Sequence, residues 1–263
     1  MRNEPVRIYK RRPKSGGAGA GCARTATRAE ACAGGKTGTQ GFEEHWYWTD
    51  QGNCRVIGLD TNDGYRVEDQ LTWLDEVLKS AAQAEHIDFV FAQFHHPHRS
   101  ESWTPGETSF STKVVEKMID FSRYTGKPSV HFFGHTHSYS RGQDRDHMHG
   151  MVNVASGMGN PDYWWEYPQA DYEEFEISTP DWGFCHVETT AGADPTMTLR
   201  RLSRGNEFVK KDNEETDLFI LKRYPVPPTT PSTKGQEPPG KALLHPPLSD
   251  EPVHRWRRNR ASP

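Results

Sequence analysis

Two clusters of histidines in this sequence each follow a short apolar run. His135 and His137 come directly after residues 130–134, and the run His95-His96-Pro97-His98 comes after residues 87–94. Imidazole is the commonest metal ligand, and two imidazoles held at a strand end suit one metal ion or two adjacent ions. Any one of these histidines, taken alone, is more readily explained as a core or loop residue. Two clusters at two strand ends together favour a shared metal site.

The elements that must position these clusters have the pattern of an α/β sheet. Residues 46–60 have the pattern of a hairpin whose second strand is buried. Residues 87–94 have the pattern of another buried strand, and a further buried strand leads to His135. Apolar residues recur at helical spacing in 68–83 and 110–125. Alternating strands and helices predict parallel strands with helices covering a face of the sheet. Because the carboxyl ends of parallel strands meet at one edge, we expect the two histidine clusters to converge there.

The sequence beyond Arg141 predicts a second, antiparallel sheet. Turn-rich or polar links with no helix pattern join short strand patterns at 151–154, 183–188, 197–202 and 218–221. The segment 160–182 is rich in Asp, Glu, Tyr and Trp. We expect it to cover the rim of a cleft rather than to form an element of its own.

The two ends of the chain differ in composition from its middle. Residues 16–40 contain no Val, Ile, Leu, Met, Phe, Tyr or Trp, so we expect residues 1–40 to be disordered. A mixture of Gly, Ala, Arg and Thr can also arise from a GC-rich gene read out of frame, which makes a non-native leader a hypothesis. Residues 225–263 hold ten of the 19 prolines and predict a disordered tail. Its basic end, 255–260, is either solvated or bound to an acidic partner. The folded domain is predicted to span 41–224.

The overall composition argues against several classes of protein. The net charge of −4 and the pI of about 6.4 give no electrostatic case for nucleic-acid binding. No run of 18 apolar residues occurs and no apolar segment follows the basic N-terminus, so we predict neither a membrane span nor a signal peptide. The expectation is a soluble chain, with its native localisation open. Cys54 and Cys185 lie in apolar strand patterns, where a buried free thiol is the default.

Several motifs resemble those of one family, and they occur in the same order. Residues 134–141, Gly-His-Thr-His-Ser-Tyr-Ser-Arg, resemble the G-H-x-H-x-Y-x-R segment of purple-acid-phosphatase-like members of the calcineurin-like metallophosphoesterases. Residues 56–61 and the Q-L-T-W-L run at 70–74 are similar to a strand and the following helix of that family. His95-His96-Pro97 is similar to its H-x-P ligand loop, and residues 154–159 to its small-residue turn. The resemblance spans about residues 41–203.

The resemblance implies a sandwich of two sheets flanked by helices around a dinuclear metal centre of iron, zinc or manganese. His95 and His135 would bind one metal ion and His137 the other, while Tyr139 and Arg141 would line the site and bind substrate. The implied reaction is hydrolysis of a phosphate mono- or diester by a metal-activated hydroxide. For Tyr139 and Arg141, loop packing and a surface charge remain the alternative.

The sequence departs from the family in lacking its D-x-H, G-D and G-N-H motifs. In the family these supply the bridging aspartate, further ligands and the histidine that handles the leaving group. Two ligands then remain for one ion and one for the other, fewer than zinc sites normally use. We therefore expect a domain incomplete on its N-terminal side, prone to aggregate through exposed sheet surface, with weak or no hydrolysis. The alternatives are an inactive binding module derived from the family and a monometal or structural histidine site.

Overall fold

Ten strands, two α-helices and one short 3₁₀ helix make up the part of the chain that the computed structural model describes, residues 45–155 and 170–224. The predicted leader at 1–40 and the predicted tail at 225–263, including its basic end, lie outside these residues. Neither of the two described α-helices is long and apolar enough to cross a membrane.

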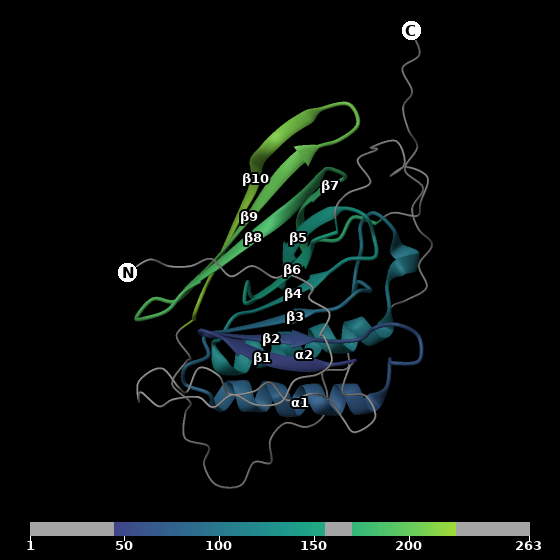
Figure 1. Cartoon of the computed structure of the whole chain (residues 1–263). Helices are drawn as coiled ribbons and strands as arrows, with labels where there is room; N and C mark the ends of the chain where they lie inside the picture. Colours follow the sequence, from purple (N-terminus) through teal and green to yellow (C-terminus); the bar gives the residue numbers. More distant parts are fainter. Residues whose placement is uncertain (1–44, 156–169, 225–263) are drawn as a thin grey trace, which may run out of the picture. The chain divides into compact units, whose positions relative to one another are not determined.

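Seven strands form the larger sheet. Their bounds are Tyr47–Gln51 (β1), Cys54–Gly58 (β2), Phe89–Gln93 (β3), Ser129–Phe133 (β4), Tyr139–Gln143 (β5), His149–Asn153 (β6) and Phe175–Thr179 (β7). They are ordered β1-β2-β3-β4-β6-β5-β7 (Figure 1). Strands β2, β3, β4 and β6 run parallel, whereas β1 is antiparallel to β2 and β5 is antiparallel to both of its neighbours. The parallel centre therefore presents the carboxyl ends of β2, β3 and β4 along one edge.

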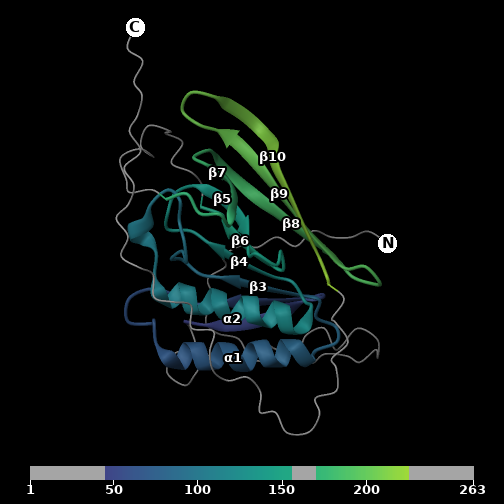
Figure 2. The same ribbon diagram turned by 180° about the vertical axis from the view of Figure 1, so that it is seen from behind.

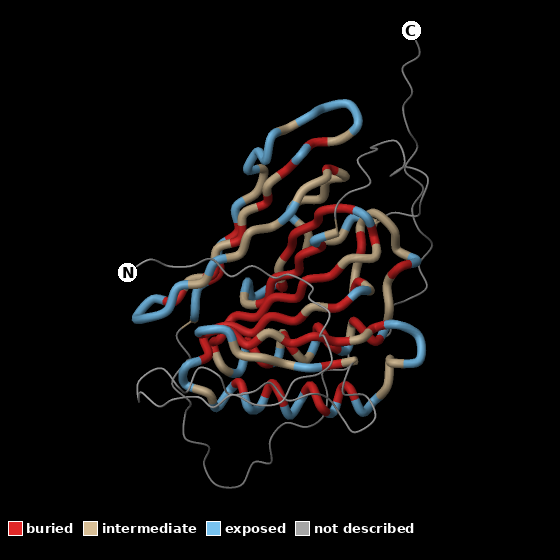
Figure 3. Tube along the Cα trace, viewed as in Figure 1, coloured by how far each residue is buried: buried red, intermediate tan, exposed pale blue. Residues whose placement is uncertain are grey.

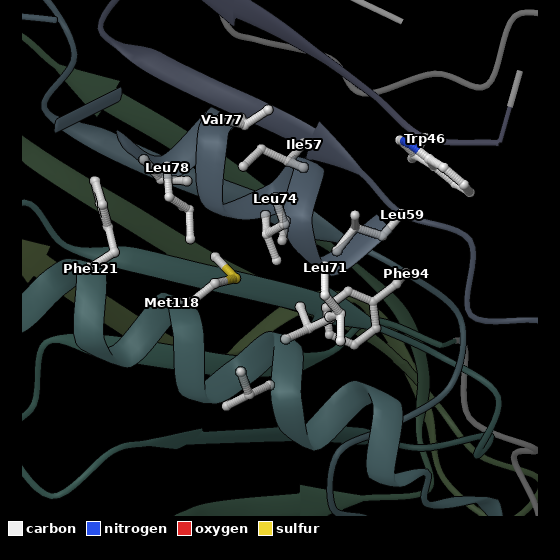
Figure 4. Packing of buried hydrophobic residues seen from close by; sticks show 14 of the residues in the cluster. Trp46, Ile57, Leu59, Leu71, Leu74, Val77, Leu78, Phe94, Met118 and Phe121 are labelled. Carbon is white, nitrogen blue, oxygen red and sulfur yellow. The ribbon is translucent and has the colours of Figure 1, made fainter. Parts of the chain in front are cut away.

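Helices α1 (Glu68–Gln83) and α2 (Ser109–Thr125) provide the connections between these parallel strands. The hydroxyl of Thr108 accepts a hydrogen bond from the backbone of Ser111 and begins α2. Gly126 ends that helix with φ of 67°, a left-handed conformation that glycine adopts without steric cost. The apolar faces of the two helices pack together against one face of the sheet. Figure 4 shows the helix residues Leu71, Leu74, Leu78, Met118 and Phe121 beside Ile57 and Leu59.

The other face of the larger sheet packs against a second sheet of three antiparallel strands, β8 (Trp182–Thr190), β9 (Thr196–Gly205) and β10 (Lys210–Lys222). Alternation along β3 explains both cores, because Phe89 and Phe91 face the second sheet while Val90 and Ala92 face the helices. Figures 1 and 2 show β8, β9 and β10 as a separate layer from two opposite sides. In Figure 3 the buried trace follows the central strands, and the β9–β10 hairpin turn is exposed.

The predicted α/β class with two sheets flanked by helices is confirmed, and two of the finer expectations are wrong. Residues 151–154 were expected in the antiparallel sheet, but β6 pairs parallel with β4 in the larger sheet. Within the segment 160–182, expected to form no element, residues 175–179 form β7 on the outer edge of β5. This pairing satisfies backbone groups of β5 that would otherwise form an open sheet edge.

Candidate metal centre

Three histidine side chains converge at the carboxyl edge of the parallel strands. His95 and His96 follow the end of β3 by two and three residues, and His135 follows the end of β4 by two. The amide of Gly134 donates a hydrogen bond to the carbonyl of His95 at 3.1 Å, which holds the two loops together. One potential ligand nitrogen from each of His95, His96 and His135 lies within 4.8 Å of the others.

The rings of His95 and His135 are in direct hydrogen-bond contact. His95 Nε2 lies 2.9 Å from His135 Nδ1, so one of these nitrogens carries the proton that the other accepts. The ring of His96 completes the group, with its centroid 4.8 Å from that of His95 and 4.5 Å from that of His135. A metal ion that replaced the proton shared by His95 and His135 would lie close to ring nitrogens of all three histidines.

Thr61, just beyond the end of β2, holds His96 in place. Its Oγ1 accepts a hydrogen bond from the backbone amide of His96 at 2.9 Å and lies 3.1 Å from the ring Nδ1. The buried side chain of Gln70 in α1 bonds both the amide and the carbonyl of Asp60, each at 2.9 Å, and so fixes the loop that carries Thr61. With Nδ1 turned toward Thr61, Nε2 is the ring nitrogen of His96 that can face a ligand.

His135 occupies a constrained position. Its φ of 67° lies in the left-handed region, which costs a residue with a side chain about 1–3 kcal/mol. Its ring centroid lies 5.1 Å from that of Trp103, and a Cβ added at Gly106 would come within 2.8 Å of its Cδ2. Backbone strain held by close packing is typical of functional sites.

The environment favours neutral imidazoles at this cluster. Burial, followed by the charges of His135, Arg66 and His95, lowers the pKa of His96 to about 4. Burial and the charges of His95, His137 and Arg66 also lower the pKa of His135. A neutral imidazole offers the lone pair that a metal ion requires, so both groups are ready for ligation at neutral pH.

The structure brings together two of the three histidines that the sequence analysis assigned to metal, and it adds His96. His137 is exposed and lies outside the set. His96 was visible in sequence as part of its cluster, but nothing in the pattern distinguished it as a ligand. Thr61 was missed altogether. The only sequence signal for Thr61 was that it follows a buried strand, and that this strand neighbours the strand leading to His95.

Tyr139 and Arg141 lie in β5, and their side chains point toward the second sheet. The hydroxyl of Tyr139 and the Nε of Arg141 each donate to Asp217 Oδ2 at 2.6 Å, and Arg141 Nη1 donates to Glu176 at 2.7 Å. Both residues are buried. These contacts explain the two side chains by packing and ion pairing inside a strand, so the alternative of loop packing and a surface charge is also wrong, and they give no support to the predicted contact with substrate.

The donor set fits one metal ion better than two. Three imidazoles with a fourth position open are a recurrent ligand set for catalytic zinc. In the described part of the chain, no other group of three His, Cys, Asp or Glu side chains converges in this way. The dinuclear centre implied by the family resemblance therefore has no second ligand set among these residues.

Comparison with known proteins gives only structural neighbours. No family model matches the sequence, and no curated protein matches it. Similar solved structures include GAP50, described as the anchor in the inner membrane complex of Plasmodium, at 14% identity, a TM-score of 0.49 and 68% coverage of this chain. Purple acid phosphatase PPD1 from yellow lupin seeds has 15% identity, a TM-score of 0.46 and 69% coverage. PhoD has 10% identity, a TM-score of 0.45 and 68% coverage.

These neighbours include a purple acid phosphatase, the group that the sequence motifs resemble. The chain spans 55% of the GAP50 structure, 33% of the PPD1 structure and 42% of the PhoD structure. At these identities and with TM-scores below 0.5, the likenesses establish no activity.

Proposed function

We propose that this chain binds one divalent transition-metal ion on His95, His96 and His135 and acts as a slow metal-dependent phosphoesterase. The observation that carries the proposal is the convergence of three imidazole nitrogens within 4.8 Å at the carboxyl edge of the parallel strands. Ligand sites of open α/β sheets usually lie at this edge. The G-H-x-H-x-Y-x-R resemblance of residues 134–141 supports the choice of phosphate esters as substrates.

The residues of the cluster have separate tasks in this proposal. His95 Nε2, His135 Nδ1 and the ring nitrogen of His96 opposite Thr61 would hold the ion. A divalent ion there supplies Lewis-acid chemistry, polarising a phosphoryl oxygen and activating water as a nucleophile. Thr61 orients the His96 ring, while Trp103 and Gly106 pack on that of His135. Zinc is the favoured ion because imidazole is a borderline ligand.

The proposed turnover is slow because the described residues offer ligands for one ion. Two-metal phosphoesterases stabilise the attacking and the leaving oxygen with separate cations. A single cation held by three neutral imidazoles supports only part of that stabilisation. The same observation favours the alternative of a monometal histidine site without hydrolysis.

Metal stoichiometry tests the proposal first. The full chain, stripped with a chelator and dialysed against zinc, is expected to retain one equivalent by elemental analysis. His135→Ala should lose that equivalent, and His137→Ala, the matched control from the same loop, should keep it. Two equivalents in the wild type, or one that survives in His135→Ala, would contradict the single-ion assignment.

Hydrolysis of p-nitrophenyl phosphate then separates the enzyme from the binding module. With zinc, iron or manganese added, we expect turnover below the usual enzyme range of about 1–1,000 per second, and its loss in His135→Ala. Zinc binding with no hydrolysis above the His135→Ala background would identify an inactive metal-binding module instead.

A further inference from the structure

The guanidinium of Arg66 is tied to the histidine cluster through Thr61. Arg66 Nε donates a hydrogen bond to the carbonyl of Thr61 at 2.7 Å, and the hydroxyl of the same residue lies 3.1 Å from the ring of His96. Arg66 belongs to the connection between β2 and α1, which reaches the same sheet edge as the loops carrying the histidines. One residue thus links a permanent cation to a proposed metal ligand.

Thr61 places Arg66 beside the cluster. Its carbonyl accepts a hydrogen bond from Arg66 Nε, and its Oγ1 accepts one from the backbone amide of His96. The chain as a whole carries a net charge of −4, so its overall charge does not attract anions. Any attraction for a phosphate at this edge must therefore come from local cations.

The carboxylate that pairs with Arg66 is weakly held. Asp63 Oδ1 lies 2.8 Å from Arg66 Nη1, but the Asp63 side chain is 94% exposed. An exposed pair three residues apart in sequence contributes little stability and exchanges readily. A phosphate, which offers a matching pair of oxygens to the planar guanidinium fork, can displace such a partner.

We propose that Arg66 is the residue that binds the phosphate group presented to the histidine cluster, and that Asp63 competes with phosphate for it. This inference rests on the proposed function. The cation held by the three histidines and the guanidinium would contact the same phosphate from two sides. Thr61, which contacts both His96 and Arg66, sets the spacing of the two positive charges.

Calorimetric titration of orthophosphate into the zinc-loaded full chain tests this assignment. Replacing Arg66 with Gln should weaken phosphate binding roughly tenfold or more, because a hydrogen-bonded charge is lost. Arg66→Lys should fall between the two, since it keeps the charge but not the fork. Asp63→Asn should tighten binding a few-fold by removing the competitor, which a merely structural role for Arg66 would not predict. In p-nitrophenyl phosphate hydrolysis, Arg66→Gln should raise KM more than it lowers kcat.

Arg123→Gln is the matched control, because Arg123 also pairs with an exposed aspartate, Asp146, but lies near the C-terminus of α2. It should leave phosphate affinity unchanged. Equal phosphate affinity in the wild type and Arg66→Gln, or no phosphate binding by the zinc-loaded wild type, would overturn the inference. Loss of zinc along with phosphate in both Arg66→Gln and Arg66→Lys would also overturn it by showing a structural role. Phosphate binding that depends on Arg66 without any ester hydrolysis would overturn the proposed function and leave this inference standing.

Discussion

His131 and His149 form a buried polar chain that the proposed metal site does not use. His131 Nδ1 lies 2.8 Å from His149 Nε2, and His149 Nδ1 lies 2.7 Å from the hydroxyl of Ser129. The Ser129 hydroxyl continues the chain to Ser122 in α2 at 2.7 Å. The two histidines are 1% and 0% exposed. Burial lowers the pKa of His149 to about 3 and that of His131 well below its usual value, so both are neutral in the folded protein.

The metal-free protein should therefore lose stability as the pH falls below about 6.5, the ordinary histidine pKa. The folded pKa is the lower one, so the unfolded state binds more protons in this range and acid favours unfolding. The stability that one such neutral histidine contributes is fully present above pH 6.5. As the pH falls toward 3, it decreases by about 1 kcal/mol of unfolding free energy per pH unit. Urea unfolding at pH 8, 7, 6 and 5 measures this slope.

His149→Asn should flatten the pH dependence, whereas His186→Gln, on the outer face of β8, should leave it unchanged. A slope in His149→Asn as steep as that of the wild type would show that other groups cause the acid sensitivity.

At the scale of the elements, a side chain from another part of the chain caps the C-terminus of α1. The buried amine of Lys127, in the connection from α2 to β4, donates to the carbonyls of Ala81, Ala82 and Ala84 at 2.9, 3.2 and 2.8 Å. These are carbonyls at the helix C-terminus, which no intrahelical amide can satisfy. A cation there also interacts favourably with the helix dipole. The contact joins the ends of both helices on the same face of the sheet.

Lys127→Met should lower the free energy of unfolding by about 1–3 kcal/mol, because it removes a charged donor from three carbonyls, among them that of the buried Ala81. Methionine preserves most of the apolar stem, so the loss reports the hydrogen bonds rather than a cavity. Lys79→Met, an exposed position on α1, is the control and should change stability by less than about 0.5 kcal/mol. Urea unfolding near pH 7 makes the comparison, and equal stability of the two variants would contradict the role assigned to Lys127.

At the scale of the whole described region, a buried ionic group joins the two sheets. Asp217 in β10 accepts from Tyr139 and Arg141 in β5, and the side chains of Asp217 and Arg141 are each 9% exposed. Apolar contacts between the sheets, such as those of Met197 and Phe132, do not require one particular geometry. The hydrogen bonds to Asp217 are directional, so they specify one alignment of the two sheets.

Asp217→Asn should destabilise the protein by about 3 kcal/mol, since it leaves the buried Arg141 with Glu176 as its remaining carboxylate. The control lies on the same strand. Glu215 pairs with Arg200 at 2.7 Å, but both side chains are more than 40% exposed, so Glu215→Gln should cost no more than about 1 kcal/mol. Thermal unfolding of the two variants compares them directly, and similar losses would show that the buried group does not hold the sheets together.

The sequence by itself determined the elements whose apolar pattern is strong. The helices near 68–83 and 110–125 and the strands leading to His95 and His135 could be predicted because apolar periodicity records which face of an element is buried. Their alternation also predicted the parallel sheet, and with it the edge where His95 and His135 meet.

Only the tertiary structure decided the rest, because it depends on contacts between segments distant in sequence. Strands β5 and β7 are short and have no strong apolar alternation, and their pairing defines them: β5 pairs with β6 and β7, and β7 forms the edge of the sheet. Once Tyr139 and Arg141 lie in a strand, the two-residue alternation sends both toward Asp217 rather than toward the histidines. His96 enters the cluster through Thr61, 35 residues earlier in the chain, and no local pattern encodes a side-chain contact of that kind.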